Sequence, residues 1–462
     1  MAWRIDWTGI NLAAGLAVTC ALVGVIAGID PRIAIAASLG IAFVLLVIAD
    51  LTVGLVAFTV LTFIALVPDV GGPAVSFLKV SGLLLAFSWL ALVTTRNDAQ
   101  SDFLSEHGGF TALVLVFLAW IGLTAVWAEE PNATLETVSR YGLNAALFLI
   151  VFTAVRRREH ALWLAAALLI GASLAAVYAL VVPPEDPAEL SRLGTSIANP
   201  NELASAVLVG FAVGVALSAG AVRRGVARAG AAFLACLCLL ALFLTLSRGG
   251  LAALAVAVVA GIVFGGRWRW GVAALGVAIA LSAVFYFQAV ASPEARERVT
   301  STASEEGEGR TDLWQIGWRM VEDKPTTGVG AGNFEHASVH YLLEPGTIRR
   351  DEFIVDEPKS AHNMYLQVFS ETGVVGLVLF SSILLLSLSC VVRAAWAFAR
   401  RGDTQLELLS RGVFVALLAL LAADFFGSRQ YAKELWLLLG LAPSLLAIAR
   451  REPEELPRRG HE

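Results

Sequence analysis

Residues 371–392 read ETGVVGLVLFSSILLLSLSCVV, and the only charged side chain in this stretch is that of Glu371 at its start. A helix needs about 20 predominantly apolar residues to cross the hydrocarbon core of a bilayer. The stretch meets this length, so it predicts a transmembrane helix. The residues before it, SAHNMYLQVFS at 360–370, already follow a helical pattern and place His362 beside Asn363 at the mouth of the predicted span.

Stretches of the same kind fill most of the chain. Of the 462 residues, 58% are hydrophobic and 15% are charged, whereas soluble domains carry about 25% charged residues. The composition therefore predicts an all-α polytopic membrane protein with 12 to 14 transmembrane helices. The range arises because the apolar run 33–67 is almost continuous and fits either two short spans or one span and a re-entrant piece. The candidate spans lie near residues 9–28, 33–49, 51–67, 76–94, 110–128, 137–155, 161–182, 203–221, 229–246, 250–266, 271–290, 371–392, 410–427 and 434–449.

The arginines predict how these helices are oriented. Short arginine-rich loops recur between the predicted spans, and such loops stay in the cytoplasm. Counting the spans places the loops on one face, together with both termini. The opposite face carries the segment 291–370, which is the one large polar region and which we expect to form an extracytoplasmic cap on the membrane bundle. The arginines on the predicted cytoplasmic face are those at 156–158, 223, 224, 228, 267, 269, 393, 400, 401, 411, 450, 451, 458 and 459.

Two other kinds of site lack support in the sequence. No basic stretch is interleaved with aromatic residues, as a nucleic-acid groove would need, so we expect no nucleic-acid partner. Cys20, Cys236, Cys238 and Cys390 all lie in apolar runs, without a CxxC motif or a Cys/His cluster. The sequence therefore predicts neither a disulfide framework nor a zinc site.

The motif SRGG at 247–250 places Arg248 between two long apolar runs on the predicted outer face. An arginine there is energetically costly unless it has a partner or reaches water. One interpretation is a tight turn whose arginine extends to the interface. The other is a guanidinium directed at an anionic group such as phosphate, with Gly249 and Gly250 letting a ligand approach the backbone.

The stretch GRTDLWQIGWRM at 309–320 predicts an amphipathic helix, because Leu313, Ile316 and Met320 recur at helical spacing. Arg310 and Trp314 lie four residues apart and share a face. The pattern fits a helix that rests on the membrane with solvated arginines. It also fits a helix in which Arg310 points inward as a second phosphate ligand.

The run KPTTGVGAGNF at 324–334 has alternating glycines before Asn333. It follows no predicted strand, so we interpret it as a shaped turn rather than a nucleotide-binding loop. His336 and His340 lie four residues apart and could share a metal ion. The sequence offers no third ligand near them, and we therefore predict no metal site.

The opening stretch supplies the last two candidates. His362 is the histidine placed just before a span on the predicted outer face, and imidazole can accept a proton near neutral pH. A histidine that merely lies at the interface fits the same pattern. Glu371 would lie at the top of the following span, where a carboxylate is costly and where pairing with an arginine is favoured.

Together these motifs resemble those of the O-antigen ligase and polymerase family of bacterial membrane glycosyltransferases. The resemblance covers roughly residues 195–380, and the first 190 residues match only as a set of spans. The two motifs around 325–334 and 362–377 are fairly specific in this order. The motifs that carry the resemblance are NPNELA at 199–204, SRGG at 247–250, GRTDLW at 309–314, PTTGVGAGNF at 325–334 and HNMYLQVFSETGVVGL at 362–377.

The resemblance implies a GT-C type fold in the bacterial cytoplasmic membrane. It implies a glycan donor carried on a polyprenyl diphosphate, such as undecaprenyl diphosphate, and transfer to an acceptor hydroxyl on the outer face without a metal or other cofactor. Arg248 and Arg310 would hold the donor diphosphate, and His362 would act on the acceptor hydroxyl. The residues implied in substrate binding or positioning are Asn201, Trp314, Asn333, Asn363 and Glu371. We expect N-terminal helices over 1–190, a core over 191–380, and C-terminal helices with a tail over 381–462.

Several functions remain compatible with the sequence. A ligase would use a lipid acceptor such as the core of lipopolysaccharide, a polymerase would use another glycan, and a protein glycosyltransferase would use a serine or threonine. A transporter of lipid-linked glycans belongs to a different class. Transporters usually carry ionisable residues at the bilayer midplane on broken helices, whereas the charges here gather at the outer mouth. A non-catalytic scaffold would leave Arg248, Arg310 and His362 far apart.

Overall fold

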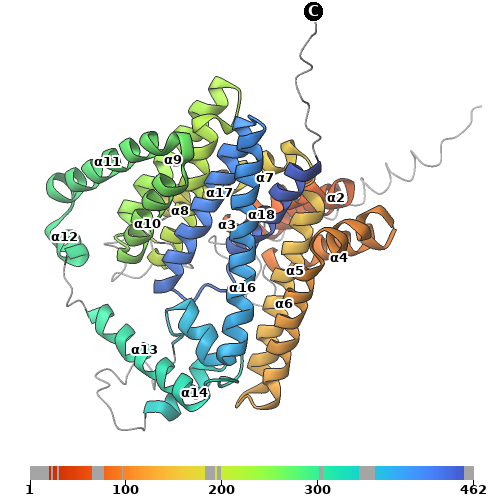
Figure 1. The fold of residues 1–462 in the computed structure, drawn as a ribbon, viewed down its shortest axis with the longest axis vertical. Coiled ribbons are helices and arrows are strands. Elements are labelled where there is room, and N and C mark those ends of the chain that lie inside the picture. Colours follow the sequence, from red (N-terminus) through yellow and green to blue (C-terminus); the bar gives the residue numbers. More distant parts are fainter. Residues whose placement is uncertain are drawn as a thin grey trace, which may run out of the picture.

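The computed structural model describes residues 31–64, 77–95, 97–182, 193–194, 199–300, 305–342 and 359–451, together with a few residues between 20 and 28. Across these residues the structure is helical and contains no strand, which confirms the all-α prediction (Figure 1). The helices are α2 (Pro31–Ala49), α3 (Leu51–Ile64), α4 (Phe77–Thr95), α5 (Asn97–Leu123), α6 (Pro131–Ala154), α7 (Arg158–Val181), α8 (Pro200–Ala216), α9 (Gly225–Leu244), α10 (Arg248–Phe264), α11 (Arg269–Phe285), α12 (Pro293–Thr300), α13 (Glu305–Asp323), α14 (Phe334–Leu342), α16 (Met364–Arg400), α17 (Thr404–Ala423) and α18 (Lys433–Arg451), with short turns of other helix types at η1 (Thr124–Val126), η2 (Leu217–Ala221), η3 (Gly266–Trp268), η4 (Tyr286–Val290) and η5 (Asp424–Phe426).

The polytopic prediction is confirmed as well. Eight helices in the described part of the chain are long and apolar enough to cross a membrane, and four shorter apolar helices accompany them. Helix α18 covers the last predicted span, 434–449. Every predicted span from 33–49 onward therefore corresponds to a helix, and the span predicted at 9–28 lies outside the described residues except for a few positions. The run 33–67 forms two helices, α2 and α3, which meet at Asp50.

Helix α18 lies at the centre of the bundle, between α6 and α16. All its side chains from Glu434 to Ala449 are buried. Small residues let neighbouring helices approach closely: a Cβ on Gly412 of α17 would lie 2.4 Å from the Cβ of Ala216 in α8. A Cβ on Gly210 would likewise lie 2.4 Å from the Cβ of Ala172 in α7. The alanine- and glycine-rich composition thus serves tight packing, as in other membrane bundles.

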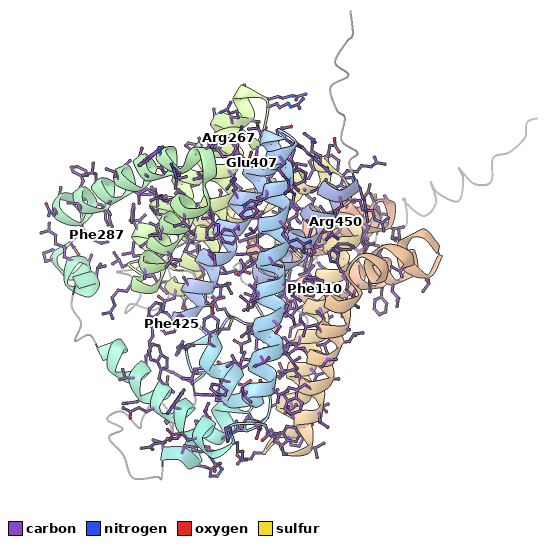
Figure 2. All side chains as sticks on the ribbon, viewed as in Figure 1. Phe110, Arg267, Phe287, Glu407, Phe425 and Arg450 are labelled. Atoms are coloured by element: carbon purple, nitrogen blue, oxygen red, sulfur yellow. The ribbon has the colours of Figure 1, made fainter. Side chains whose placement is uncertain are left out.

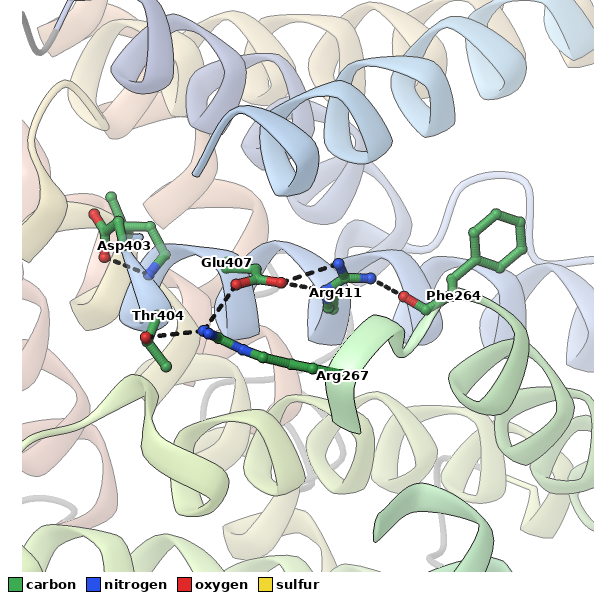
Figure 3. A network of polar contacts seen from close by, with 7 residues as sticks. Phe264, Arg267, Asp403, Thr404, Glu407 and Arg411 are labelled. Atoms are coloured by element: carbon green, nitrogen blue, oxygen red, sulfur yellow. Dashed lines mark hydrogen bonds and ion pairs between the residues drawn. The ribbon is translucent and has the colours of Figure 1, made fainter. Parts of the chain in front are cut away.

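Ion pairs tie the helix junctions together at one end of the bundle, which we call the arginine-rich end. Arg158, at the start of α7, lies 2.6 Å from a carboxylate oxygen of Asp403, just before α17. The buried carboxylate of Glu407 in α17 accepts hydrogen bonds from Arg267 at 3.0 Å and from Arg411 at 3.0 and 3.1 Å (Figure 3). These contacts join loops that are far apart in sequence, so the arginine loops do gather on one side as expected.

The opposite end carries α13 and α14 of the polar segment, which pack together (Figure 1). The predicted apolar face of α13 is buried against protein rather than left for lipid. It contributes to a small separate core consisting of Leu313, Ile316, Met320, Val329, Phe334, Ala337, Tyr341 and Ala361. Helices α13 and α14 therefore form a packed cap on the bundle, whereas α12 contacts η4 instead.

The cap is fixed to the bundle at a break in α16. Gly373 interrupts the helix with φ +67°. The glycine run 324–334 docks onto this break: the N–H of Val374 donates to the carbonyl of Pro325 at 2.8 Å, and the N–H of Gly330 donates to that of Glu371 at 2.9 Å. The break separates a short helical segment, 364–372, from the apolar span that follows. His362 is thereby held at the head of a segment that the cap supports.

Candidate active site at three helix N-termini

Three helices begin beside one another at the end of the bundle opposite the arginine-rich end. Each starts with a side chain that caps its first turn: Asn199 caps α8, Ser247 caps α10 and Asn363 caps α16. The capping oxygens accept backbone N–H groups at 3.0 to 3.1 Å. The hydroxyl of Ser247 also donates to Oδ1 of Asn201 at 2.7 Å, which joins the starts of α8 and α10. Because the N-terminus of a helix carries partial positive charge, the arrangement favours an anion.

A small polar cavity of about 80 Å³ lies between these helix starts. Asn201, Ser247, His362 and Arg429 line it from four different segments. Gly249 and Gly250, the two residues after Arg248, also line it, so Arg248 lies at the edge of the cavity where α10 begins. The structure thus brings together the regions of Arg248 and His362 that the sequence singled out separately.

The backbone beside this cavity is strained at two positions. Among the described residues, Leu246 and His362 are the non-glycine residues with positive φ, at +51° and +48°. A non-glycine residue in this conformation costs about 1–3 kcal/mol, and such residues cluster at functional sites. Leu246 directly precedes Ser247, and His362 directly precedes Asn363. Each strained residue therefore lies immediately before the N-cap of a helix at the site.

The two glycines of SRGG serve helix packing. A Cβ on Gly249 would lie 3.0 Å from the Cβ of Phe426, and a Cβ on Gly250 would lie 2.8 Å from that of Ala204 in α8. Larger residues there would push α10 away from α8 and from η5. The glycines therefore hold the α10 N-terminus close to the cavity.

Arg429 is a site residue that the sequence reasoning missed. It lies between α17 and α18, pairs with Glu434, and donates to the backbone carbonyl of Glu202 at 3.2 Å. Burial lowers the pKa of Arg429, but the carboxylates of Glu434, Asp424 and Glu202 raise it above its usual range. The guanidinium therefore stays protonated on the cavity wall, where it is paired with Glu434 and where Glu202 also lines the cavity. The signal was present in FGSRQ at 426–430, where an arginine lies between two apolar runs just as Arg248 does.

Helix α13 positions Trp314 against the site. The indole N–H of Trp314 donates to the carbonyl of Ala361 at 3.0 Å, next to His362. Arg310 lies one turn earlier on the same face of α13 and is half-buried. The side chains of Trp314, Trp318, Tyr365, Phe369 and Phe425 line an open groove of about 870 Å³, which also includes Asn363.

This groove adjoins the polar cavity, because His362 and Phe426 line the cavity whereas their neighbours Asn363 and Phe425 line the groove. Figure 2 labels Phe425 between the helical bundle and α13. The aromatic faces suit an apolar chain or a sugar ring. The site therefore combines a small polar pocket with an adjoining aromatic groove.

Asn333 and Glu371 lie behind the glycine run instead. Asn333 is fully buried, accepts the N–H of Glu130 at 2.7 Å and donates to Thr134 at 3.0 Å. Glu371 accepts the N–H of Gly332 at 2.8 Å and a side-chain N–H of Gln367 at 3.0 Å. Asn363 uses its side-chain oxygen to cap α16. Asn333 and Glu371 contact protein in the structure, so their predicted substrate role would act through the loop. Asn363 also lines the groove.

The comparison with protein families bears on the central part of the chain. Residues 232–381 match the model of the O-antigen ligase family. The match includes Arg248, Arg310 and His362, and it confirms the resemblance for this part of the chain. No curated protein matches the chain. The fold and the family match together indicate a multi-pass bacterial membrane protein and a membrane glycosyltransferase of the ligase or polymerase type.

Proposed function

We propose that this protein transfers a glycan from a polyprenyl diphosphate to an acceptor hydroxyl at the outer face of the bacterial cytoplasmic membrane. The observation that carries the proposal is the convergence of three helix N-termini and Arg429 on the cavity that His362 lines. The positive ends of the helix dipoles, together with Arg248 at the edge of the cavity, suit a diphosphate, whose negative charge grows as it leaves the sugar. The adjoining aromatic groove offers room for the apolar or sugar part of a substrate.

The reaction follows from this arrangement in one displacement. The acceptor oxygen bonds to the anomeric carbon as the bond from that carbon to the diphosphate oxygen breaks. The diphosphate keeps the electron pair, and the acceptor proton passes to the imidazole of His362. A single displacement inverts the anomeric configuration. The positive groups stabilise the leaving diphosphate more than the bound donor. They therefore lower the activation barrier of transfer as well as the dissociation constant of the donor.

Arg248 and Arg310 are assigned to the donor diphosphate. Arg248 begins α10 at the edge of the cavity, and Arg310 lies one turn from the tryptophan that bonds to Ala361. The guanidinium fork suits phosphate oxygens in two parallel hydrogen bonds. A lysine at either position would keep the charge and lose this geometry.

The proposal is tested by transfer in reconstituted vesicles. Purified protein would receive a polyprenyl-diphosphate glycan and three acceptors: a lipopolysaccharide core, a second lipid-linked glycan and a serine-containing peptide. Mass spectrometry would follow the product with and without a chelator. We expect transfer that survives the chelator, and the acceptor that is used would distinguish ligase, polymerase and protein glycosyltransferase.

His362→Asn is the sharpest variant for the base. Asparagine tolerates the left-handed backbone that His362 adopts, so the protein should fold, while the amide cannot accept the proton. We expect the transfer rate to fall by about 10² to 10⁴, with an unchanged melting temperature. Full activity of this variant would exclude His362 as the base. Movement of the lipid between leaflets without transfer would instead support the transporter alternative.

A further inference from the structure

A second hollow lies at the arginine-rich end, between the last turns of α16 and α18. It has a volume of about 490 Å³ and lies at the opposite end of α16 from His362. Four arginines line it, three from α16 or its end and one from α18, and we call it the arginine basin. Figure 2 labels Arg450 toward the same end of the bundle as Arg267 and Glu407. The arginines are Arg393, Arg400, Arg401 and Arg450.

The positive charge of the basin is not neutralised by the described part of the chain. No aspartate or glutamate among the described residues lines it. None of its four guanidinium groups forms a hydrogen bond or ion pair with a described residue. Other arginines at this end do form ion pairs: Arg158, Arg267 and Arg411 each contact a carboxylate. The basin therefore presents four cations to a ligand from outside the fold.

The depth of the basin indicates where that ligand comes from. Arg393 and Arg400 are seven residues apart and share a face, so they lie about 10 Å apart along the helix axis. Arg400 ends the helix, and Arg393 lies two turns deeper. Ala397, Leu446 and Ala449 also line the hollow, which gives it an apolar part. Trp396 is 59% exposed beside them, as is typical of tryptophan at a membrane interface.

We propose that the arginine basin binds an anionic phospholipid with two phosphate groups, of the diphosphatidylglycerol type. A guanidinium group can donate two parallel hydrogen bonds to the oxygens of one phosphate. Four guanidinium groups at two depths of the hollow fit a ligand with two phosphates better than a ligand with one. Basic pockets between transmembrane helices are the kind of site that such headgroups occupy. The bound lipid would bridge α16 to the central helix α18. The proposal does not depend on the glycosyltransferase reaction.

The test is lipid binding by the full-length protein. Protein purified in a neutral detergent would be titrated with cardiolipin or with phosphatidylcholine, and native mass spectrometry would count the bound lipids. We expect one cardiolipin to be retained, with little phosphatidylcholine. The variant R393Q/R450Q should bind cardiolipin at least tenfold more weakly, and R400Q/R401Q should also weaken it. Equal binding of both lipids, or no effect of either variant, would overturn the proposal.

A matched control removes the same charge elsewhere. Arg223 and Arg224 lie at the exposed α8–α9 turn of the same end and line none of the cavities described above, so R223Q/R224Q should bind cardiolipin within twofold of the unchanged protein. Inorganic diphosphate should compete poorly. Competition as strong as that of the lipid would mean that the basin takes a soluble anion, and the proposal would fail.

The tail supplies the remaining alternative occupant. Glu452, Glu454 and Glu455 follow α18 in the sequence. The full-length variant E452Q/E454Q/E455Q should bind cardiolipin as the unchanged protein does. Binding that arises only in this variant would identify the tail carboxylates as the natural occupant and overturn the lipid assignment.

Discussion

At the scale of single residues, Arg429 shows how a buried charge is stabilised beside the candidate active site. Its guanidinium is mostly buried, with 15% of the side chain exposed. It pairs with Glu434 and has Asp424 nearby. Breaking a buried pair is costly because the partner is left charged without compensation. The network therefore fixes the loop between α17 and α18 as well as the charge on the cavity wall.

Replacing this arginine should destabilise the protein strongly. We expect Arg429→Met to lower the free energy of unfolding by about 3–5 kcal/mol, measured as a fall in melting temperature in detergent. Arg140→Met is the control, since Arg140 and Glu136 form a pair whose side chains are 53% and 63% exposed. Exposed pairs contribute about 0–1 kcal/mol. Similar losses in the two variants would show that Arg429 is not held as a buried pair.

At the scale of secondary-structure elements, the break in α16 decides where the site lies. The glycine run and the broken helix satisfy each other's backbone groups, which fixes the segment 364–372 and the cap together. Gly373 is essential to this contact, because a Cβ there would lie 2.0 Å from the carbonyl oxygen of Thr326. An unbroken helix would have no exposed backbone for the cap to bind.

The comparison of two glycines tests this element. Gly373 and Gly402 have similar φ values, +67° and +72°, but a Cβ on Gly402 would meet nothing within 4 Å. Gly402→Ala should therefore cost only the backbone strain, about 1–2 kcal/mol. Gly373→Ala should cost clearly more and should also increase proteolysis within 305–342, measured by limited digestion. Equal effects of the two substitutions would mean that the cap does not depend on the break.

At the scale of the whole molecule, the two ends of the bundle carry different chemistry. One end collects arginines, ion-paired or in the basin, and the other collects the capped helix starts and His362. Short arginine-rich loops mark the cytoplasmic side. The separation of the two ends predicts that the candidate active site faces away from the cytoplasm.

Site-specific labelling checks this orientation. A cysteine at Glu136, exposed on α6 near the site end, should react with a membrane-impermeant maleimide added to intact cells. A cysteine at Arg224, exposed at the arginine-rich end, should react only after the membrane is opened. The unchanged protein, with Cys20, Cys236, Cys238 and Cys390, provides the background. The reverse pattern of labelling would place the candidate site in the cytoplasm.

The sequence by itself determined the class of fold and most of the candidate residues. A continuous apolar run of about 20 residues can satisfy its backbone hydrogen bonds within one segment as a helix, and each predicted span from 33–49 onward corresponds to a helix. The motifs around Arg248, Arg310 and His362 were visible because charged or titratable residues beside apolar runs are costly and so stand out. The family match over 232–381 includes all three positions.

The tertiary structure alone decided which of these residues meet. It joined the starts of α8, α10 and α16 through the Ser247–Asn201 contact, and it added Arg429 from the loop before α18. It also showed that Asn333 and Glu371 hold the glycine run. Sequence periodicity reports only which residues share a face within one element. Contacts between elements depend on how helices distant in the chain pack against one another. The pattern of a single sequence does not show which helices become neighbours.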